Sequence, residues 1–456
     1  MTLRSIIELK RIAFRNLARH RVKTALTVLA IAVSTAMYIF LDGWLLGMRL
    51  DSQRNIVSYE TGAAKLQLAA YIDKLDELPM YENFDGWEAY AAALDRAGYD
   101  TAPRFVFSGT LYSENGSAPV LFIGCDPDSE RNVLRWQDFI EDGSPLRNGM
   151  IGDNGLPLPQ IVLGAMTADR LGVSTGGKLN RINGALPPVR ITTAIDIKDE
   201  RGVVRHVYQV IDAVVAGVVN SPNPKNNNNA AWIPLDVLQD DNGLMLDGKV
   251  TELLIRAKNA DDTRLPARNE QPAAITAALT DALGGALPAG LDVYGWQVYT
   301  ADYEAARQSD DVSSRIMTAV LFILAFLGIA NTMLLAILER TKEIGMMRAQ
   351  GMTDGELTAA YMLEAGMTGF FGAFAGVAIG CLCTIPMVKY GIDFSAMMDA
   401  MGGDIGYRVT GLFRSAWNLP VIIGSGLAAT LISAGTAYFP IRRALKMAIT
   451  DSLRFE

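Results

Sequence analysis

Histidine and cysteine are scarce in this sequence. Only His20 and His206 occur among 456 residues, so imidazole catalysis and histidine-ligated zinc have almost no material to work with. The three cysteines are Cys125, Cys381 and Cys383. The last two lie two positions apart in an apolar run, and therefore on different faces of a helix. We expect all three to be small buried hydrophobic residues, and we expect no metal site.

The sequence also lacks a complete phosphate-binding loop. The stretch GVSTGGKL, residues 172–179, has the form G-x-x-x-x-G-K, but Leu179 stands where such a loop needs Ser or Thr for Mg²⁺. The stretch follows a predicted helix rather than a strand, and a glycine-rich turn at a helix C-terminus explains its glycines. We therefore expect no catalytic residue, no cofactor and no ATP hydrolysis in this chain itself.

Charge is unevenly distributed along the chain, whose net charge is −8. Residues 1–24 carry seven Lys or Arg against Glu8 alone, a net charge of +6, whereas residues 49–314 carry 23 Lys or Arg and 37 Asp or Glu, a net charge of −14. An acidic domain of this size does not attract nucleic acid. The basic N-terminal segment suits anionic lipid, and we expect residues 1–23 to form an amphipathic helix on the membrane surface or against a partner.

Long apolar runs are present, and they indicate a membrane protein. About 20 apolar residues cross the hydrocarbon core of a bilayer, and four segments reach that length, namely 24–48, 315–338, 362–388 and 416–439. The first has too long an apolar stretch for a cleaved signal peptide, so we expect it to remain as an anchor. A mean hydropathy of +0.18 fits a few spans combined with a large polar domain. The only acidic residues within the spans are Asp42 and Glu364, each near one end, so no row of intramembrane charges predicts an ion pathway.

Lys and Arg near the spans place both chain ends in the cytoplasm. The expected fold class is an α-helical membrane protein with four transmembrane helices and a large extracytoplasmic mixed α/β domain inserted between helices 1 and 2. The segments expected in chain order are a cytoplasmic helix at 1–23, a span at 24–48, the extracytoplasmic domain at 49–314, a span at 315–338, a cytoplasmic loop at 339–361, a span at 362–388, an outer loop at 389–415, a span at 416–439 and a cytoplasmic tail at 440–456.

Local patterns predict several elements in the extracytoplasmic domain. Buried strands are expected at 120–126, 207–219 and 251–257, helices at 86–97 and 270–284, and a strand followed by a short helix across 160–173. The stretch NSPNPKNNNN, residues 220–229, reads as a loop. Residues 299–338 are expected to form one long helix that runs into the second span.

The charged stretch ERTKEIGMMRAQG, residues 339–351, lies between two predicted spans. Gly351 suits the position after a helix end, and Thr353 with Glu356 fits the S/T-x-x-E capping box of a new helix. The segment is therefore expected to be a structured helical turn rather than a slack connection. Ile344, Met346 and Met347 are apolar side chains that a partner's groove could bury. The alternative is a plain loop helix with no partner.

These residues resemble the FtsX/MacB-like permeases of ATP-binding-cassette (ABC) systems. ERTKEIGMMRAQGMTDGEL, residues 339–357, is similar to that family's inner loop, YFPIRRALKMAITDSLRFE, residues 438–456, to its closing motif, and FRNLARHRVKTALTVLAIAV, residues 14–33, to its opening. Residues 102–130 and 161–179 resemble the lipoprotein-releasing permeases of the LolC/LolE type.

The resemblance implies a subunit of the bacterial inner membrane that works as a mechanical lever. Two permeases, the second being a copy or a paralogue, would assemble with a dimer of ABC ATPase subunits that bind ATP and Mg²⁺. The surface contacting the ATPase would be formed by Glu339, Arg340, Lys342, Glu343, Ile344, Met346, Met347, Arg348 and Gly351.

The cargo implied is a lipoprotein that enters sideways from the membrane lipid between the first and second spans. A possible lining is the helical face formed by Met37, Phe40, Trp44 and Met48. Packing against a sister span is the alternative for these four residues. Other functions that the resemblance leaves open are export of a macrolide, a peptide or a lipid, and a lever that moves no cargo but activates an extracytoplasmic partner such as a wall hydrolase.

Overall fold

The computed structural model describes residues 21–446 except 154–155, 199–203, 240–242, 262–263 and 395–411. Within 301–340 it describes only 303–305, 307–309, 312–313, 316–317, 319–320, 323, 327 and 334–335. Most of the N-terminal helix, the second span, the outer loop and the second half of the tail, all predicted from the sequence, therefore lie outside the described residues.

The chain divides into two compact units, which are described separately. We call residues 1–49, 307–393 and 412–456 the helical unit, and residues 50–306 with 394–411 the sheet unit. The boundary at Arg49 falls within one continuous helix, α2 (Arg21–Ile56), which passes into a π-helical turn, η1 (Val57–Thr61).

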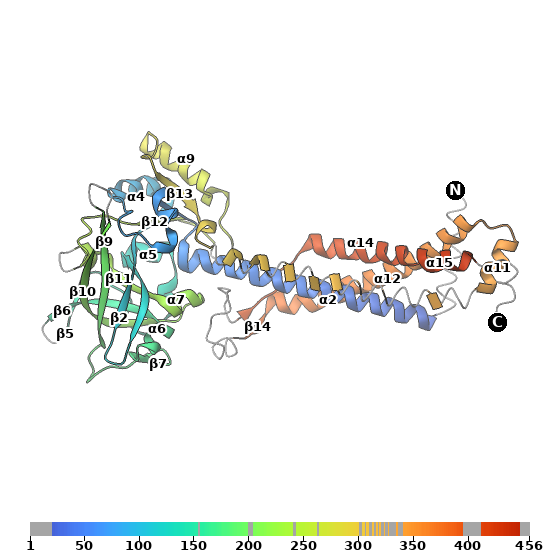
Figure 1. The fold of residues 1–456 in the computed structure, drawn as a ribbon, viewed down its shortest axis with the longest axis horizontal. Coiled ribbons are helices and arrows are strands. Elements are labelled where there is room, and N and C mark those ends of the chain that lie inside the picture. Colours follow the sequence, from blue (N-terminus) through green and yellow to red (C-terminus); the bar gives the residue numbers. More distant parts are fainter. Residues whose placement is uncertain are drawn as a thin grey trace. The chain divides into compact units, whose positions relative to one another are not determined.

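Eleven strands form the main sheet among the described residues, in the order β13-β1-β12-β2-β3-β11-β6-β10-β4, with β5 on β6 and β9 on both β10 and β2 (Figure 1). Their bounds are β1 Ala64–Leu68, β2 Tyr99–Tyr112, β3 Ser117–Cys125, β4 Ile140–Gly143, β5 Met150–Asp153, β6 Leu156–Gly164, β9 Pro188–Lys198, β10 Val204–Val219, β11 Ala230–Pro234, β12 Glu252–Ala257 and β13 Leu291–Gly295. A separate two-stranded hairpin consists of β7 (Ser174–Thr175) and β8 (Lys178–Leu179).

Six of these strands close into a ring. Strand β2 pairs with β3, β3 with β11, β11 with β6, β6 with β10, β10 with β9, and β9 returns to β2 at Thr110–Tyr112. Closure leaves no unpaired edge within the ring. The return to β2 requires Gly109, because a Cβ atom there would lie 2.9 Å from the carbonyl oxygen of Thr192.

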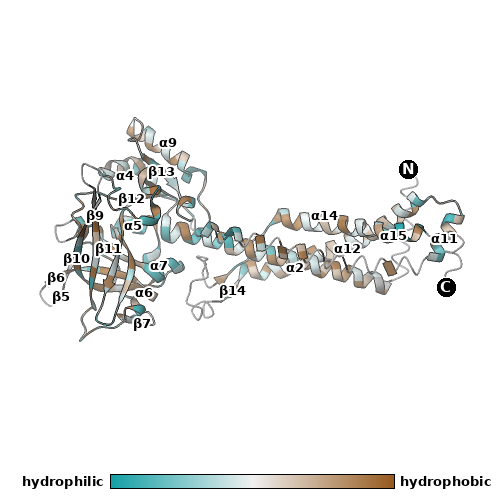
Figure 2. Ribbon diagram, in the orientation of Figure 1, coloured by the Kyte–Doolittle hydropathy of each residue, from teal (hydrophilic) through white to brown (hydrophobic). Residues whose placement is uncertain are grey.

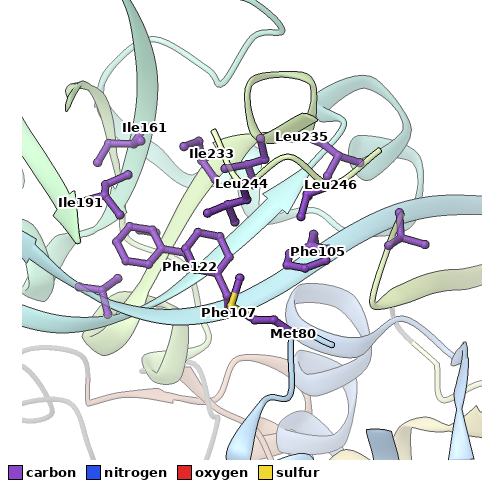
Figure 3. Close-up of a cluster of buried hydrophobic side chains, with 14 of the residues drawn as sticks. Met80, Phe105, Phe107, Phe122, Ile161, Ile191, Ile233, Leu235, Leu244 and Leu246 are labelled. Carbon is purple, nitrogen blue, oxygen red and sulfur yellow. The ribbon is translucent and has the colours of Figure 1, made fainter. Parts of the chain in front are cut away.

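The main hydrophobic core gathers side chains from the strands of this ring. Phe107 of β2 and Phe122 of β3 are fully buried and stack with ring centroids 5.1 Å apart. Ile161, Ile191 and Ile233 come from three further strands and are buried in the same cluster (Figure 3). Each such side chain contributes about 1.5–3 kcal/mol by leaving water.

A second core cluster contains the one cysteine of the sheet unit. Cys125 at the end of β3 is fully buried, and Trp136 and Trp232 stack within the same cluster with ring centroids 4.3 Å apart. Burial raises the pKa of the Cys125 thiol well above its usual value, and the nearby Glu130 carboxylate raises it further. The prediction of a small buried hydrophobic residue is confirmed for this cysteine. It is wrong for Cys383, which is exposed, and Cys381 is only partly buried.

Helices of the sheet unit connect the strands. Among the described residues they are α3 Ala69–Ile72, α4 Trp87–Arg96, α5 Pro127–Val133, α6 Ala165–Arg170, α7 Pro224–Asn229, α8 Leu235–Gln239 and α9 Pro272–Leu283. The strands and helices predicted for the domain are confirmed by β3, β10, β12, α4, α9 and the β6–α6 pair. The predicted burial of 207–219 is wrong at the start of β10, where Val207, Tyr208 and Val210 are exposed. The loop predicted at 220–229 is confirmed for 220–223 and wrong for 224–229, which form α7. Asn223 caps this helix by accepting a hydrogen bond from the backbone N–H of Lys225 at 3.1 Å.

The helical unit contains α2 together with α11 (Thr341–Ala349), α12 (Asp354–Lys389), α14 (Leu419–Thr436) and α15 (Tyr438–Leu445). Three helices of the described chain are long and apolar enough to cross a membrane, over Thr24–Thr61, Asp354–Lys389 and Leu419–Leu445. Figure 2 shows apolar residues along α2, α12 and α14, and hydrophilic residues at α11. Two short strands between α12 and α14, β14 (Ile392–Asp393) and β15 (Leu412–Phe413), pair in antiparallel fashion.

A seam of glycines brings α12 against α2. A Cβ atom at Gly376 would lie 2.7 Å from the carbonyl oxygen of Ala32, and one at Gly372 would lie 2.7 Å from Cβ of Ile31. A Cβ atom at Gly380, one turn further along, would lie 3.1 Å from Cα of Ala36. Small residues four positions apart allow helix backbones to approach closely, which is how spanning helices associate where no hydrophobic driving force acts between them.

Candidate functional site

The charged stretch between the predicted spans folds into a helix, a tight turn and a second helix. Helix α11 ends in a Schellman motif, in which Met352 N–H donates to the carbonyl of Met347 at 3.1 Å and Gly351 N–H donates to that of Arg348 at 3.0 Å. Gly351 has a φ of +96°, a conformation that glycine adopts without strain. The prediction that Gly351 occupies the position after a helix end is therefore confirmed.

The second helix, α12, begins at the predicted capping box. The hydroxyl of Thr353 accepts a hydrogen bond from Glu356 N–H at 3.3 Å, and the Glu356 carboxylate accepts one from Thr353 N–H at 3.0 Å. Two backbone donors that would otherwise have no partner at the helix start are thereby satisfied. The turn between α11 and α12 is thus determined at both sides by local hydrogen bonds.

Helix α11 is anchored by one apolar face. Ile344 is 1 % exposed and packs in a cluster with Leu357 and Tyr361 of α12 and Ile441 of α15. The expectation that Ile344 offers an apolar tip to a partner is corrected by this packing, because its apolar side chain is already buried within the chain. Met347 lies partly buried against the same cluster.

The opposite face of α11 is exposed in the part of the chain that the structure describes. Lys342 is exposed and Met346 is 50 % exposed, and the two lie one helical turn apart. Glu343 and Arg348 are partly covered, and Nε of Arg348 pairs with the Asp354 carboxylate at 3.2 Å across the turn. Of the residues expected to contact an ATPase, Glu339 and Arg340 lie outside the described residues. The exposed apolar contact that remains is Met346.

Loss of the helix cap is expected to loosen the start of α12. Thr353→Ala removes the hydroxyl that accepts from Glu356 N–H, at a cost of about 1 kcal/mol. We expect amide hydrogen exchange over residues 354–357 to become about fivefold faster, as measured by mass spectrometry. Thr358→Ala is the matched control, because the Thr358 hydroxyl bonds back to the Asp354 carbonyl and caps nothing. Equal acceleration in both variants would contradict a capping role.

The four residues proposed to line a cargo path lie on α2. Met37 is 48 % exposed, and the rings of Phe40 and Trp44 lie 6.4 Å apart between their centroids. The side of α2 that packs on α12 includes Ala32 and Ala36, and Phe40 lies one turn after Ala36 beside that side, whereas Met37 lies further around the helix. Met37 and its neighbours form an apolar face of α2. The described part of this chain leaves Met37 uncovered.

A polar contact near the same stretch was not predicted from the sequence. The side-chain amide of Asn418 donates to the Asp42 carboxylate at 2.8 Å, and Ala416 N–H donates to the carbonyl of Gly43 at 2.8 Å. Gly47 lies so close to the carbonyl oxygen of Arg414 that a Cβ atom would stand 1.9 Å from it. The segment before α14 is thus attached to α2 within the helical unit. The only signal for this attachment in the sequence was that Asp42, Gly43 and Gly47 lie close together within the predicted span.

Within the sheet unit, polar side chains hold the π-helical turn η1 in place. The amide of Asn226 donates to the Tyr59 carbonyl at 2.8 Å, Nη1 of Arg104 donates to the Glu60 carbonyl at 3.1 Å, and Lys225 pairs with the Glu60 carboxylate at 2.6 Å. Asn223 donates to the other Glu60 oxygen at 3.1 Å. The asparagine-rich stretch therefore fastens the continuation of α2 to the sheet, a role its composition alone does not reveal.

The loop-like motif GVSTGGKL has no phosphate-binding geometry. It starts at the C-terminal turn of α6, where Gly172 has a φ of +65°, and it continues into the β7–β8 hairpin. A phosphate-binding loop leads from a strand into a helix N-terminus. The interpretation as a helix C-terminal turn is confirmed for Gly172, whereas Gly176 and Gly177 form the turn of the β7–β8 hairpin.

Two family descriptions match most of the chain. Residues 24–266 match the MacB-like periplasmic core domain, and residues 315–449 match the FtsX-like permease C-terminal region. The first match alone covers more than half of the chain.

Curated relatives agree with these matches. An uncharacterized ABC transporter permease of Methanocaldococcus jannaschii is 29 % identical over 31 % of this chain and 32 % of its own length. The lipoprotein-releasing system transmembrane protein LolC of Neisseria meningitidis is 25 % identical over 79 % of this chain and 80 % of its own length. The macrolide export ATP-binding/permease protein MacB of Chromobacterium violaceum is 25 % identical over 54 % of this chain and 34 % of its own length.

The chain thus spans about a third of the Methanocaldococcus permease and of MacB, and four fifths of LolC. Three apolar helices of spanning length accompany a sheet unit whose residues 50–266 fall within the matched periplasmic core domain. This protein belongs to the FtsX/MacB-like ABC transporter permeases.

Proposed function

We propose that this chain is the permease subunit of an ABC transporter that works as a mechanical lever and releases lipoproteins from the bacterial inner membrane. The observation that carries the proposal is the rigid mounting of α11, whose buried face packs on α12 and α15 while Lys342 and Met346 stay open. A push on that open face would be transmitted into α12, which is long enough to cross the bilayer.

ATP hydrolysis belongs, in this proposal, to a dimer of separate ATPase subunits that bind ATP and Mg²⁺ and press on α11. A second permease, either a copy or a paralogue, completes the assembly. Both chain ends and α11 face the cytoplasm, the sheet unit lies outside, and residues 315–338 supply the fourth span. The basic residues Arg442 and Arg443 of α15 support this orientation, since cytoplasmic segments next to spans carry an excess of Lys and Arg.

Lipoprotein is the favoured cargo because the match to LolC extends along four fifths of that protein. The uncovered apolar face of α2 at Met37 would meet the acyl chains of such a cargo. Macrolide or peptide export is the second candidate, favoured by the matches to MacB proteins of several bacteria. Lipid export, and activation of an outer wall hydrolase without transport, are further alternatives.

Photo-crosslinking in cells distinguishes these cargoes. A photoreactive amino acid placed at Met37, in the complex purified with its ATPase, is expected to yield an adduct with a triacylated protein, identified by mass spectrometry. The matched control is the same amino acid at Phe374 of α12, which is 69 % exposed but belongs to another helix. An adduct with a second copy of this chain at Met37 would support sister-span packing instead, and recovery of a wall hydrolase without lipidated protein would exclude lipoprotein release.

A further inference from the structure

The sheet unit contains a cavity of about 350 Å³ beside the π-helical turn η1. One wall is apolar and comes from the strands, through Val106 of β2 and Leu121 and Ile123 of β3. A polar part of the wall lies beside it on the neighbouring strands of the same sheet and includes Lys65 of β1 and Glu252 of β12. A cavity of this size with an apolar wall and a few convergent polar groups has the general character of a small-ligand site.

Charged side chains that line this cavity are buried to an unusual degree. The side chains of Lys65, Arg104 and Glu252 are 9 %, 4 % and 4 % exposed. Nζ of Lys65 bonds Oε2 of Glu252 at 2.7 Å and lies 4.3 Å from the centroid of the Tyr299 ring. Buried ion pairs of this kind add little net stability, because desolvation of both charges offsets their attraction. Their presence in a cavity wall therefore calls for another reason.

Two hydrogen-bonding capacities remain available in that wall. Oε1 of Glu252 is buried and accepts no hydrogen bond, and it lies 3.6 Å from Nη1 of Arg104, which is too far for one. The Lys65 ammonium group has three donors, of which one serves Glu252. Since Lys65 and Glu252 are bonded to each other, this acceptor and these donors are neighbours. Arg104 offers less, because its Nε and Nη2 atoms already bind the Glu130 carboxylate.

The charges around the cavity balance. Three cationic side chains, Lys65, Arg104 and Lys225, face three anionic ones, Glu60, Asp76 and Glu252. A cavity without net charge does not select a charged ligand over a neutral one by long-range attraction. An uncharged ligand that carries a donor next to an acceptor could hydrogen-bond to Glu252 and Lys65. An aliphatic group on the same ligand could pack against the apolar residues of the wall.

We propose that this cavity binds a short uncharged segment of extended peptide. Its peptide groups present N–H to Oε1 of Glu252 and C=O to the Lys65 ammonium group, and one aliphatic side chain packs against Val106, Leu121 and Ile123. The cavity lies directly beside Glu60 and Lys225, which fasten η1, so a bound peptide would touch the same turn that continues α2. The site is independent of which cargo the transporter moves.

The test uses the full chain in lipid nanodiscs with its ATPase subunit. The probe is an acetylated and amidated tripeptide, Ala-Leu-Ala, whose central leucine carries a photoreactive diazirine. Irradiation followed by peptide mapping is expected to give saturable labelling on residues 104–108 and 120–124. Replacing the central residue of an unlabelled competitor with Lys or Glu is expected to weaken competition at least tenfold, because a charged side chain would be forced against the apolar wall.

Variants at the mouth of the cavity provide the controls. Val298→Trp and, separately, Asn229→Trp alter exposed residues that line the cavity, so they should fold normally and reduce labelling at least fivefold. Leu283→Trp at the exposed end of α9 is the matched control and should leave labelling unchanged. Labelling spread over the surface, or unaffected by both mouth variants, would overturn the proposal. So would a copurified lipid or carbohydrate occupying the cavity without any peptide adduct. Neither transport nor cargo release is measured, so failure of the lipoprotein assignment would not affect the outcome.

Discussion

The double variant Lys342→Glu, Met346→Asp is expected to lose its ATPase subunit while remaining folded in the membrane. Lys342 and Met346 lie one turn apart on the open face of α11, and neither belongs to the cluster that anchors the helix. The change reverses one charge and places a second carboxylate where an apolar side chain would be buried by a partner. Removing a central apolar anchor from an interface costs 2 kcal/mol or more, and an unpaired charge adds to that loss.

The choice of positions depends on the structure. Met347 and Arg348 are neighbours in the sequence, but Met347 contacts the cluster around Ile344, and Arg348 pairs with Asp354. Substituting either would disturb the α11–α12 turn itself, so a lost ATPase could then reflect local unfolding. Substituting Lys342 and Met346 instead tests ATPase binding without disturbing the turn, since their side chains point away from the cluster.

Association is measured by copurification and by titrating the purified ATPase onto the permease in nanodiscs. We expect the dissociation constant to rise at least 100-fold, which corresponds to about 2.7 kcal/mol. The matched control is Lys178→Glu with Met150→Asp, the same pair of changes at exposed residues of the sheet unit, and it should leave the dissociation constant unchanged. Normal association of the α11 variant would refute this face as the contact surface.

Features set by local hydrogen bonds were predictable from the sequence. The end of α11 at Gly351 and the capping box of Thr353 and Glu356 require only residues within one or two turns, so their motifs identify them directly. The run at 207–219 likewise indicates a strand, because it is rich in Val, a β-branched residue that favours that state. Such features depend little on what the rest of the chain does.

Features that depend on distant partners were not predictable in the same way. The return of β2 to β9 joins Thr110 to Thr192 and closes the ring of strands, and no local pattern marks it. The asparagine-rich stretch reads as a loop because its composition favours turns. It becomes a short helix because its amides find partners far away in the sequence, such as the Tyr59 carbonyl and the Glu60 carboxylate.

The exposed face of α11 was only partly predictable for the same reason. Sequence spacing shows that Ile344 and Met347 share one side of a helix, but not which side faces the protein. Contacts with Leu357 and Ile441 decide the matter, and the second of these lies almost a hundred residues away. The site that remains for a partner is therefore smaller and more polar than the sequence suggested.

Gly376→Leu is expected to push α12 away from α2 and to destabilise the helical unit. A Cβ atom at this position would lie 2.7 Å from the carbonyl oxygen of Ala32 and from Cβ of Thr35, and 3.0 Å from Cα of Ala32. Two of these three atoms belong to the backbone of α2, so no change of side-chain rotamer can relieve the overlap. The helices must instead move apart along the seam, which also loses the contacts at Gly372 and Gly380.

Overpacking of this kind costs about 1–3 kcal/mol, and more where the backbone must move. We expect the midpoint of thermal unfolding in detergent, followed by size-exclusion chromatography, to fall by about 10 °C. Gly424→Leu in α14 is the matched control, because a Cβ atom there has nothing within 4 Å. It introduces the same side chain into another apolar helix, so any general effect of leucine on insertion appears in both variants. A similar fall for Gly376→Leu and Gly424→Leu would mean that the seam does not hold α2 to α12. A large fall for Gly376→Leu alone would establish close backbone packing along the seam as the interaction that holds α12 to α2.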